Sequence, residues 1–161
     1  MSNFDAIISL VLAWEGGRSD DPTDPGGYTA YGISHAAYPS LDLSTLTMDA
    51  AKDIYRRDYW APLRLDEIPA PVALLVLDSA INQGKRAATT MLQQALGGGV
   101  SVDGVMGDQT IAACLRAPVA HLAHDYAVLR VLRYTETLNW PKYGHGWMNR
   151  LLDLYGKAVG L

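Results

Sequence analysis

Apolar residues recur at helical spacing from the start of the chain. The apolar positions of the first segment lie three or four residues apart: Phe4, Ile7, Ile8, Val11 and Trp14. This period predicts a helix with one buried face. Ser2 and Asp5 have the spacing of a capping box at its start, and the glycine pair 16–17 ends it. Glu15 therefore falls in the last turn of this helix.

The helical pattern returns after residue 47 and continues to the end of the chain. Thr47 and Asp108 are placed to cap helices, Pro62 and Gly84 to end them. The helices predicted from these signals span residues 48–60, 71–83, 87–96, 108–115, 118–139 and 146–159, with a short helical turn over 34–38.

Residues 18–33 break the helical pattern with a run of Gly, Pro and Asp. A connection of this length is usually functional or disordered. The run Tyr28–Tyr31 is typical of a short strand, so we expect a small hairpin here. The pattern as a whole predicts a mainly α fold with one small β-hairpin near the N-terminus.

The triple glycine 97–99 is the candidate linker, but the apolar faces before and after it depend on each other for burial. We therefore expect one domain over residues 1–161.

Composition narrows the possible functions. The chain has 161 residues, 49% of them hydrophobic, and a net charge of −4, which argues against a general nucleic-acid binder. Its single cysteine, Cys114, excludes a disulfide framework. Residues 1–80 carry 12 acidic and 5 basic side chains, whereas residues 81–161 carry 5 acidic and 8 basic ones. Carboxylate chemistry is expected in the first half, and the second half has the charge to meet an anionic partner or is ordinary solvated surface.

Several common sites are missing from the sequence. It contains no G-x-S-x-G, H-E-x-x-H or G-x-x-x-x-G-K-[ST] motif. His121 and His124 share a helical face but have no third ligand nearby, so we expect no metal site and no cofactor. The apolar stretch 7–14 is too short to span a bilayer and follows no basic residue, so we expect neither a signal peptide nor membrane insertion.

Glu15 is the main candidate for chemistry. A carboxyl group at the end of an apolar helix can be partly buried, and burial and the helix dipole both favour the protonated form that a general acid needs. Cleavage of a glycosidic bond requires such an acid and a second group that manages water. Asp24 and Thr29 are the candidates for that group. The alternative is that Glu15 faces solvent and the acidic residues 20, 21 and 24 only form turns.

Three motifs around Glu15 resemble glycoside hydrolase family 108, a family of phage and prophage muramidases. They are E-G-G at 15–17, D-P-x-D-x-G-G at 21–27 and T-x-x-G-I at 29–33. The resemblance implies a lysozyme-like fold with Glu15 as proton donor, and it maps Asp24 and Thr29 onto the groups that position the attacking water. The gap between these two is one residue short, so Asp21 or Asp20 remains an alternative. This chain also has Arg18 where the family commonly has Tyr.

The resemblance continues through 54–60 and 77–84, which are similar to the family's middle segments, and through 92–96 and 102–110, which are similar to its predicted peptidoglycan-binding segment. Residues 146–150 are similar to the family's ending. It divides the chain into a catalytic part, 1–84, and a peptidoglycan-binding-like part, 85–161, packed on it. It implies bacterial peptidoglycan as the partner of a monomeric enzyme. The enzyme would be made in the host cytoplasm and reach the wall after release by a holin.

Four residues are candidates for substrate binding. Asp78 and Asn82 are four apart on one helix face and either line the sugar cleft or form a polar pair. Trp60, next to Tyr59, either stacks on a sugar ring or belongs to the core. Tyr31 lies inside the third motif.

The function that the resemblance implies is hydrolysis of the β-1,4 bond between N-acetylmuramic acid and N-acetylglucosamine by a phage endolysin. The alternatives are a lytic transglycosylase and a non-catalytic peptidoglycan-binding module.

Overall fold

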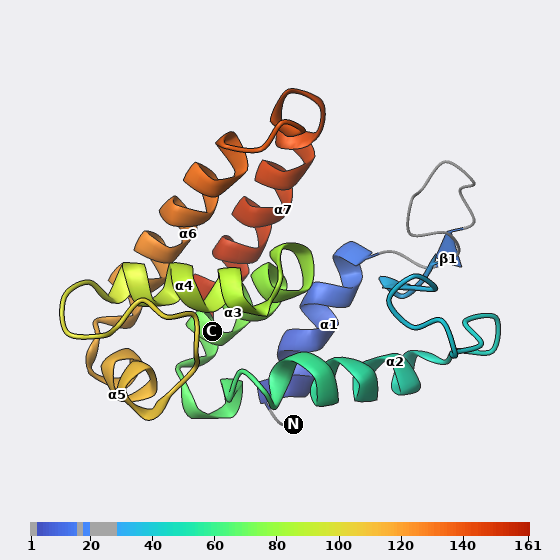
Figure 1. Ribbon diagram of the computed structural model, residues 1–161, viewed down its shortest axis with the longest axis horizontal. Coiled ribbons are helices and arrows are strands. Elements are labelled where there is room, and N and C mark those ends of the chain that lie inside the picture. Colours follow the sequence, from blue (N-terminus) through green and yellow to red (C-terminus); the bar gives the residue numbers. More distant parts are fainter. Residues whose placement is uncertain (1–2, 16–17, 20–28) are drawn as a thin grey trace.

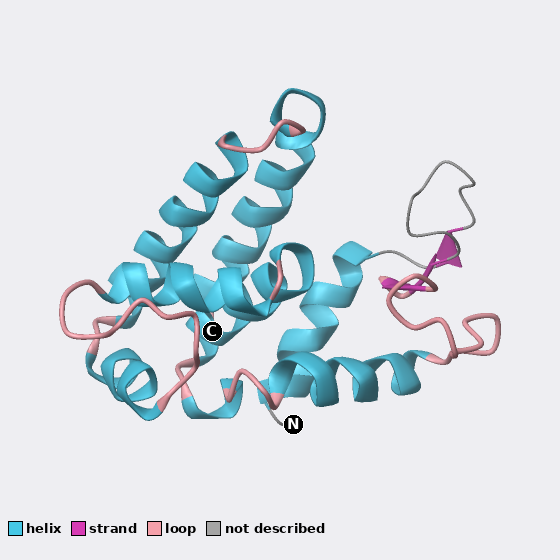
Figure 2. Cartoon of the chain, viewed as in Figure 1, coloured by secondary structure: helices cyan, strands magenta, loops and turns pink. Residues whose placement is uncertain are grey.

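The chain folds into a group of packed helices with a small β-sheet at one side (Figure 1). This computed structural model describes residues 3–15, 18–19 and 29–161. Figure 2 shows how far helix dominates the described chain. The elements in these residues are α1 (Asn3–Glu15), β1 (Arg18–Ser19), β2 (Thr29–Ala30), β3 (Ile33–Ser34), α2 (Met48–Tyr55), π-helix η1 (Arg56–Trp60), 3₁₀-helix η2 (Leu65–Glu67), α3 (Ala70–Gln83), α4 (Lys85–Leu96), α5 (Asp108–Arg116), α6 (Val119–Thr135) and α7 (Trp140–Val159).

The first helix agrees with its sequence pattern at four of the five apolar positions. Phe4, Ile7, Ile8 and Val11 are buried, whereas Trp14 is 38% exposed, and α1 ends at Glu15 as predicted. The position of this end matters because it determines where the candidate acid lies.

The β-sheet is slightly larger than expected. Strands β1, β2 and β3 form an antiparallel sheet in that order. Ala30 pairs with Ile33, so a two-residue turn joins β2 to β3. The predicted hairpin is confirmed with a third strand added. The short helical turn expected over 34–38 is present as a single turn, closed by a hydrogen bond from Tyr38 N to Ser34 O at 3.1 Å, and Pro39 follows it.

The helix predicted over 48–60 is present, but its second part is widened. Thr47 caps α2, its side chain accepting a hydrogen bond from Ala50 N at 3.2 Å. In η1 the Ala61 N–H bonds to Arg56 O at 2.9 Å, which is the five-residue step of a π-helix. Short π-helices are frequent at functional sites because they change the direction of neighbouring side chains.

Helix α3 forms the centre of the core. Its residues 72–80 are all buried. It packs against α1, α4, α6 and α7, so it has no face left for solvent. Helix α3 belongs to the first half of the chain and packs against α4, α6 and α7 of the second half. The two halves, divided at residue 84, therefore share one core.

The last two helices differ most from the prediction. Helix α6 ends at Thr135 instead of 139, and α7 starts at Trp140 instead of Gly146. Gly144 lies inside α7, where an added Cβ would come within 2.6 Å of the Trp140 ring. Glycine here allows close packing and does not end a helix. The two helices lie side by side as an arm that rises from the rest of the structure (Figure 1).

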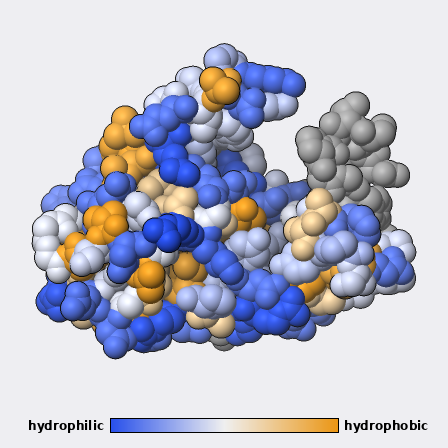
Figure 3. Space-filling model, viewed as in Figure 1, coloured by the Kyte–Doolittle hydropathy of each residue, from blue (hydrophilic) through white to orange (hydrophobic). Residues whose placement is uncertain are grey.

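Figure 3 shows the surface hollowed between this arm and the side that carries the β-sheet. None of the helices in the described ranges has the length and apolar character needed to cross a membrane.

We predict that Leu75→Ala lowers the free energy of unfolding by about 2–5 kcal/mol, because it leaves a cavity at the centre of the core. Leu75 is fully buried in α3. The matched control is Leu138→Ala, since Leu138 is 100% exposed, and its effect should stay within about 0.5 kcal/mol. Urea denaturation of both variants measures this difference, and equal losses would contradict the central place of α3.

Candidate active site

Glu15 lies at the C-terminal end of α1, where its side chain is 14% exposed. One carboxylate oxygen, Oε1, accepts a hydrogen bond from Nη2 of Arg150 on α7. The first and last helices of the chain thus meet at this carboxyl group.

The turn between β2 and β3 covers the other side of Glu15. Tyr31 and Gly32 have φ angles of +53° and +78°, the left-handed region that a two-residue hairpin turn requires. A Cβ added to Gly32 would lie 2.8 Å from Glu15 Oε2 and 2.6 Å from the Tyr55 hydroxyl. Only glycine allows the backbone to approach the carboxyl this closely.

Tyr55 holds this turn in place. Its hydroxyl donates a hydrogen bond to Tyr31 O at 2.9 Å. Burial and then the nearby charge of Glu15 raise the pKa of the Tyr55 phenol well above its usual range. Tyr55 therefore keeps its proton and remains a donor throughout the accessible pH range.

Arg150 also binds a second carboxylate. Its Nε donates to Oδ1 of Asp78 on α3 at 2.8 Å. Burial lowers the pKa of the Arg150 guanidinium, but Asp78 and Glu15 raise it by more, so the net shift is upward. Arg150 therefore stays charged between its two acidic partners.

Asp78 has a further partner in Arg130 of α6. Nη2 of Arg130 lies 2.5 Å from Asp78 Oδ2, and both side chains are fully buried. The guanidinium also lies 5.4 Å from the centre of the Tyr134 ring. Glu15, Arg150, Asp78 and Arg130 thus form a row of alternating charges, called the charge row below, and it links α1, α7, α3 and α6.

A small cavity opens beside Glu15. It has a volume of about 160 Å³, and Gly32 and Tyr55 belong to its wall together with Tyr38 and Tyr59. Aromatic rings of this kind offer flat faces to a sugar.

The structure places the residues expected from the sequence in different settings. Thr29 is half-buried in β2, and Tyr31 is half-buried in the turn beside Glu15. Asn82 is exposed, and its amide donates to Asp78 O at 2.8 Å, so the predicted polar pair is present. Asp24, and with it Asp20 and Asp21, lies outside the described residues.

Two predicted substrate contacts are wrong. The Trp60 side chain is 1% exposed and packs edge-on against Phe4, with 5.2 Å between ring centres. Asp78 is fully buried and bound by two arginines, so it supports the site from inside and does not face the cleft.

The sequence interpretation missed both arginines and Tyr55. Arg130 lies between Tyr126 and Tyr134 on the buried face of α6. A basic residue on an apolar stripe needs an acidic partner in the core, and this pattern was the available signal. Arg150 stands in a motif that resembles the family ending, next to Leu151, but spacing did not reveal its partner.

Comparisons with known proteins give two family matches and a similar solved structure. Residues 8–84 match the family glycosyl hydrolase 108, and residues 87–152 match the family described as predicted peptidoglycan domain. Among solved structures, SagA of Brucella abortus is similar over 98% of this chain and 94% of its own, with 32% identity and a TM-score of 0.87. No curated protein matches the chain.

We predict that Asp78→Asn lowers the free energy of unfolding by about 3–5 kcal/mol, because it leaves the buried Arg130 without a compensating charge. The control is Lys157→Gln, which breaks the surface pair with Asp153 and should cost less than about 1 kcal/mol. Chemical denaturation near neutral pH compares the two variants. Similar small losses would show that the charge row contributes little to folding.

Proposed function

The chain belongs to the glycosyl hydrolase 108 family, and we propose that it hydrolyses the β-1,4 bond between N-acetylmuramic acid and N-acetylglucosamine in peptidoglycan. The family makes it a glycoside hydrolase, and the second family match makes peptidoglycan its partner. The observation that carries the finer proposal is the Glu15 carboxyl group, which is held between Arg150 and the Gly32 turn at the edge of a cavity lined by tyrosines.

In the proposed reaction Glu15 acts as the general acid. Its carboxyl proton passes to the glycosidic oxygen as the bond between that oxygen and the anomeric carbon breaks. The electron pair of the broken bond stays with the leaving oxygen, and Glu15 becomes a carboxylate. Arg150 stabilises this carboxylate, since the guanidinium already binds Oε1.

A water molecule then adds to the anomeric carbon through its oxygen, and a second carboxylate is needed to orient it and to take up the proton that it loses. Glu15 regains its own proton from solvent before the next cycle. Asp78 is unsuitable because it is fully buried between Arg130 and Arg150. We propose Asp24 for this role, with Thr29 as an additional hydrogen-bonding group from β2. Asp21 and Asp20 are the alternatives.

The biological role proposed from the family resemblance is that of a phage endolysin, which reaches the host wall after release by a holin. The direct test is lysis of a bacterial host that produces the protein with and without a co-expressed holin.

We predict that Glu15→Gln lowers the rate of peptidoglycan cleavage by at least about 10²–10⁴-fold, because an amide cannot donate the proton. The change keeps the size of the side chain, so the variant should remain folded. Glu136→Gln is the control, since Glu136 is exposed beyond the end of α6 and should keep full activity.

Mass spectrometry of the released muropeptides identifies the reaction. Reducing N-acetylmuramic acid ends support hydrolysis, whereas 1,6-anhydro ends would indicate a lytic transglycosylase. Binding without any product would indicate a non-catalytic module. Normal cleavage by a folded Glu15→Gln variant would contradict the role of Glu15.

We predict that Asp24→Asn loses most activity while Thr29→Val loses at most about tenfold. A carboxylate can hold the water and also offset positive charge on the sugar, whereas a neutral hydrogen bond contributes only about 0.5–1.5 kcal/mol. Asp21→Asn and Asp20→Asn, assayed in parallel, decide which carboxylate acts. An active Asp24→Asn beside an inactive Asp21→Asn would move the role to Asp21.

A further inference from the structure

A line of connected depressions leads away from Glu15 toward the second half of the chain. The cavity beside Glu15 shares Tyr38 and Tyr59 with a neighbouring depression that also contains Asp58 and Lys85. Lys85 in turn lines a larger basin of about 840 Å³. Shared wall residues thus link three depressions, from the cavity whose wall contacts Glu15, past two tyrosines, to this basin.

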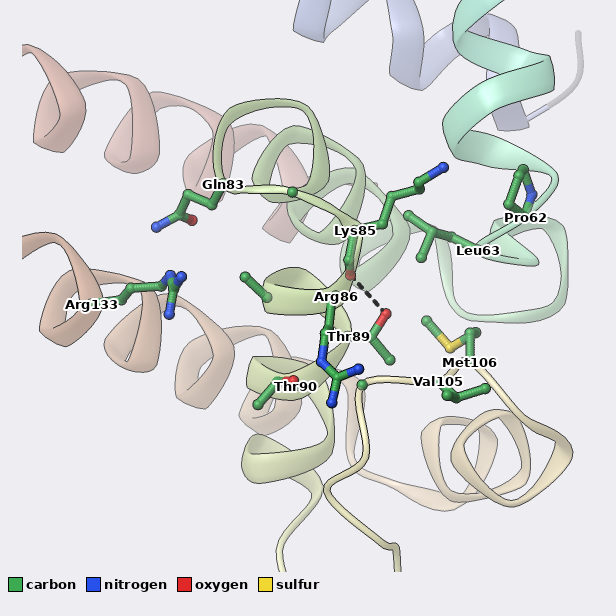
Figure 4. A pocket seen from close by; sticks show the side chains of 13 residues that line it. Pro62, Leu63, Gln83, Lys85, Arg86, Thr89, Thr90, Val105, Met106 and Arg133 are labelled. Atoms are coloured by element: carbon green, nitrogen blue, oxygen red, sulfur yellow. Dashed lines mark hydrogen bonds between the residues drawn. The ribbon is translucent and has the colours of Figure 1, made fainter.

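The basin has a basic wall. Lys85 and Arg86 come from the first turn of α4, and Arg133 reaches it from α6 (Figure 4). Of the described residues that line the basin, none is acidic. The N-terminus of α4, which begins at Gly84 without a side-chain cap, adds partial positive charge to the same wall.

The three cations are available to a ligand. In the described part of the chain none of them forms a salt bridge. Lys85 Nζ donates to the main-chain oxygen of Asp58 at 2.9 Å, while the Asp58 carboxylate is bound at 2.7 Å by both Arg57 Nε and Nη2. Lys85 therefore forms no salt bridge with that carboxylate, although its charge contributes a small part of the lowering of the Asp58 pKa.

Arg86 has one acidic neighbour, Asp103, which does not line the basin. The Asp103 carboxylate accepts hydrogen bonds from Val105 N and Gln93 Nε2, both at 2.8 Å. These bonds, with a smaller effect of Arg86, lower the pKa of Asp103. The Asp103 carboxylate is thus bound by groups other than Arg86. Within the described residues the Arg86 guanidinium forms no salt bridge.

The loop that carries Gly104 fixes Arg86 in place. Gly104 has a φ of +75°, and an added Cβ would lie 2.7 Å from Arg86 Cγ and 3.1 Å from Thr90 Oγ1. The loop backbone therefore packs directly on α4 at the basin, so the stem of Arg86 is held before a ligand arrives.

The substrate class proposed above has two chemically distinct parts. The glycan strand consists of uncharged N-acetylated rings apart from the lactyl group of muramic acid, and this group carries a short peptide with free carboxylates. Aromatic faces suit the sugar rings, while fixed cations suit the carboxylates. The cleft has both surfaces in sequence: tyrosines next to Glu15, then the basic basin.

We infer that the basin lined by Lys85, Arg86 and Arg133 binds the carboxylates of the peptide stem of peptidoglycan. The inference rests on the proposed function, because it assumes that the sugar chain lies along the tyrosines beside Glu15. It assigns the preference for peptide-bearing glycan to the second half of the chain and the chemistry to the first half.

The test compares peptide-bearing peptidoglycan with glycan strands from which an amidase has removed the peptides. The variant K85Q/R86Q/R133Q should raise KM on the peptide-bearing substrate by about tenfold or more, because it removes charge-assisted contacts. Its kcat, and its KM on stripped strands, should change less than about twofold, and added salt should weaken the effect in the wild type. If the KM on peptide-bearing substrate, divided by the KM on stripped strands, is the same in this variant as in the control, the inference is overturned.

The control is K52Q/R116Q/K142Q, which changes net charge equally at cations outside the three depressions. It separates binding in the basin from general attraction to an anionic wall.

A binding measurement keeps the inference testable if no cleavage is found. Calorimetry on Glu15→Gln protein compares a soluble disaccharide-peptide with the bare disaccharide. Tighter binding of the first, lost in K85Q/R86Q/R133Q but kept in K52Q/R116Q/K142Q, supports the basin as the peptide site. Equal affinity for the two ligands contradicts it. Absence of product from wild-type protein on both polymers would instead count against the proposed function.

Discussion

The buried carboxylate of Asp78 constrains the rest of the structure. A fully buried charge is costly unless it is paired, and Asp78 is paired twice, with Arg130 and Arg150. These partners require α6 and α7 to pack on α3 at one fixed register. Nη2 of Arg150, which also contacts Asp78, then meets Glu15 at the end of α1. The same row of charges thus holds four helices together and orients the candidate acid.

Close approach is the second requirement of the site. The Gly32 turn lies against both Glu15 and Tyr55, and an added Cβ would be within 3 Å of atoms of each. The carboxyl group is therefore enclosed by a guanidinium on one side and by backbone on the other. Such enclosure limits the orientations of Glu15, and two of its neighbours, Gly32 and Tyr55, also form part of the wall of the adjacent cavity. A general acid benefits from this restriction, because its proton must point at one oxygen.

The uneven distribution of charge along the chain also acquires a structural meaning. The excess of basic residues after residue 80 includes Arg130 and Arg150, which serve the interior, and Lys85, Arg86 and Arg133, which line the surface basin. One group neutralises a carboxylate of the first half, and the other faces solvent next to the cleft. The two halves therefore depend on each other for both stability and the shape of the cleft.

Local pattern was sufficient to predict most elements of the fold. Helical spacing and the glycines after Glu15 predicted the end of α1, and the strand-like run Tyr28–Tyr31 predicted the hairpin, because these signals act over a few residues. The start of α7 was misjudged, since Gly144 and Gly146 lie inside the helix, where Gly144 allows close approach of the Trp140 ring. The charge row could not be read from spacing. Its partners are 72 and 135 residues apart in sequence, and only the packing of α1, α3, α6 and α7 decides which charges meet. The same packing buries Asp78 and Trp60, for which the local pattern had left substrate binding as one of two alternatives.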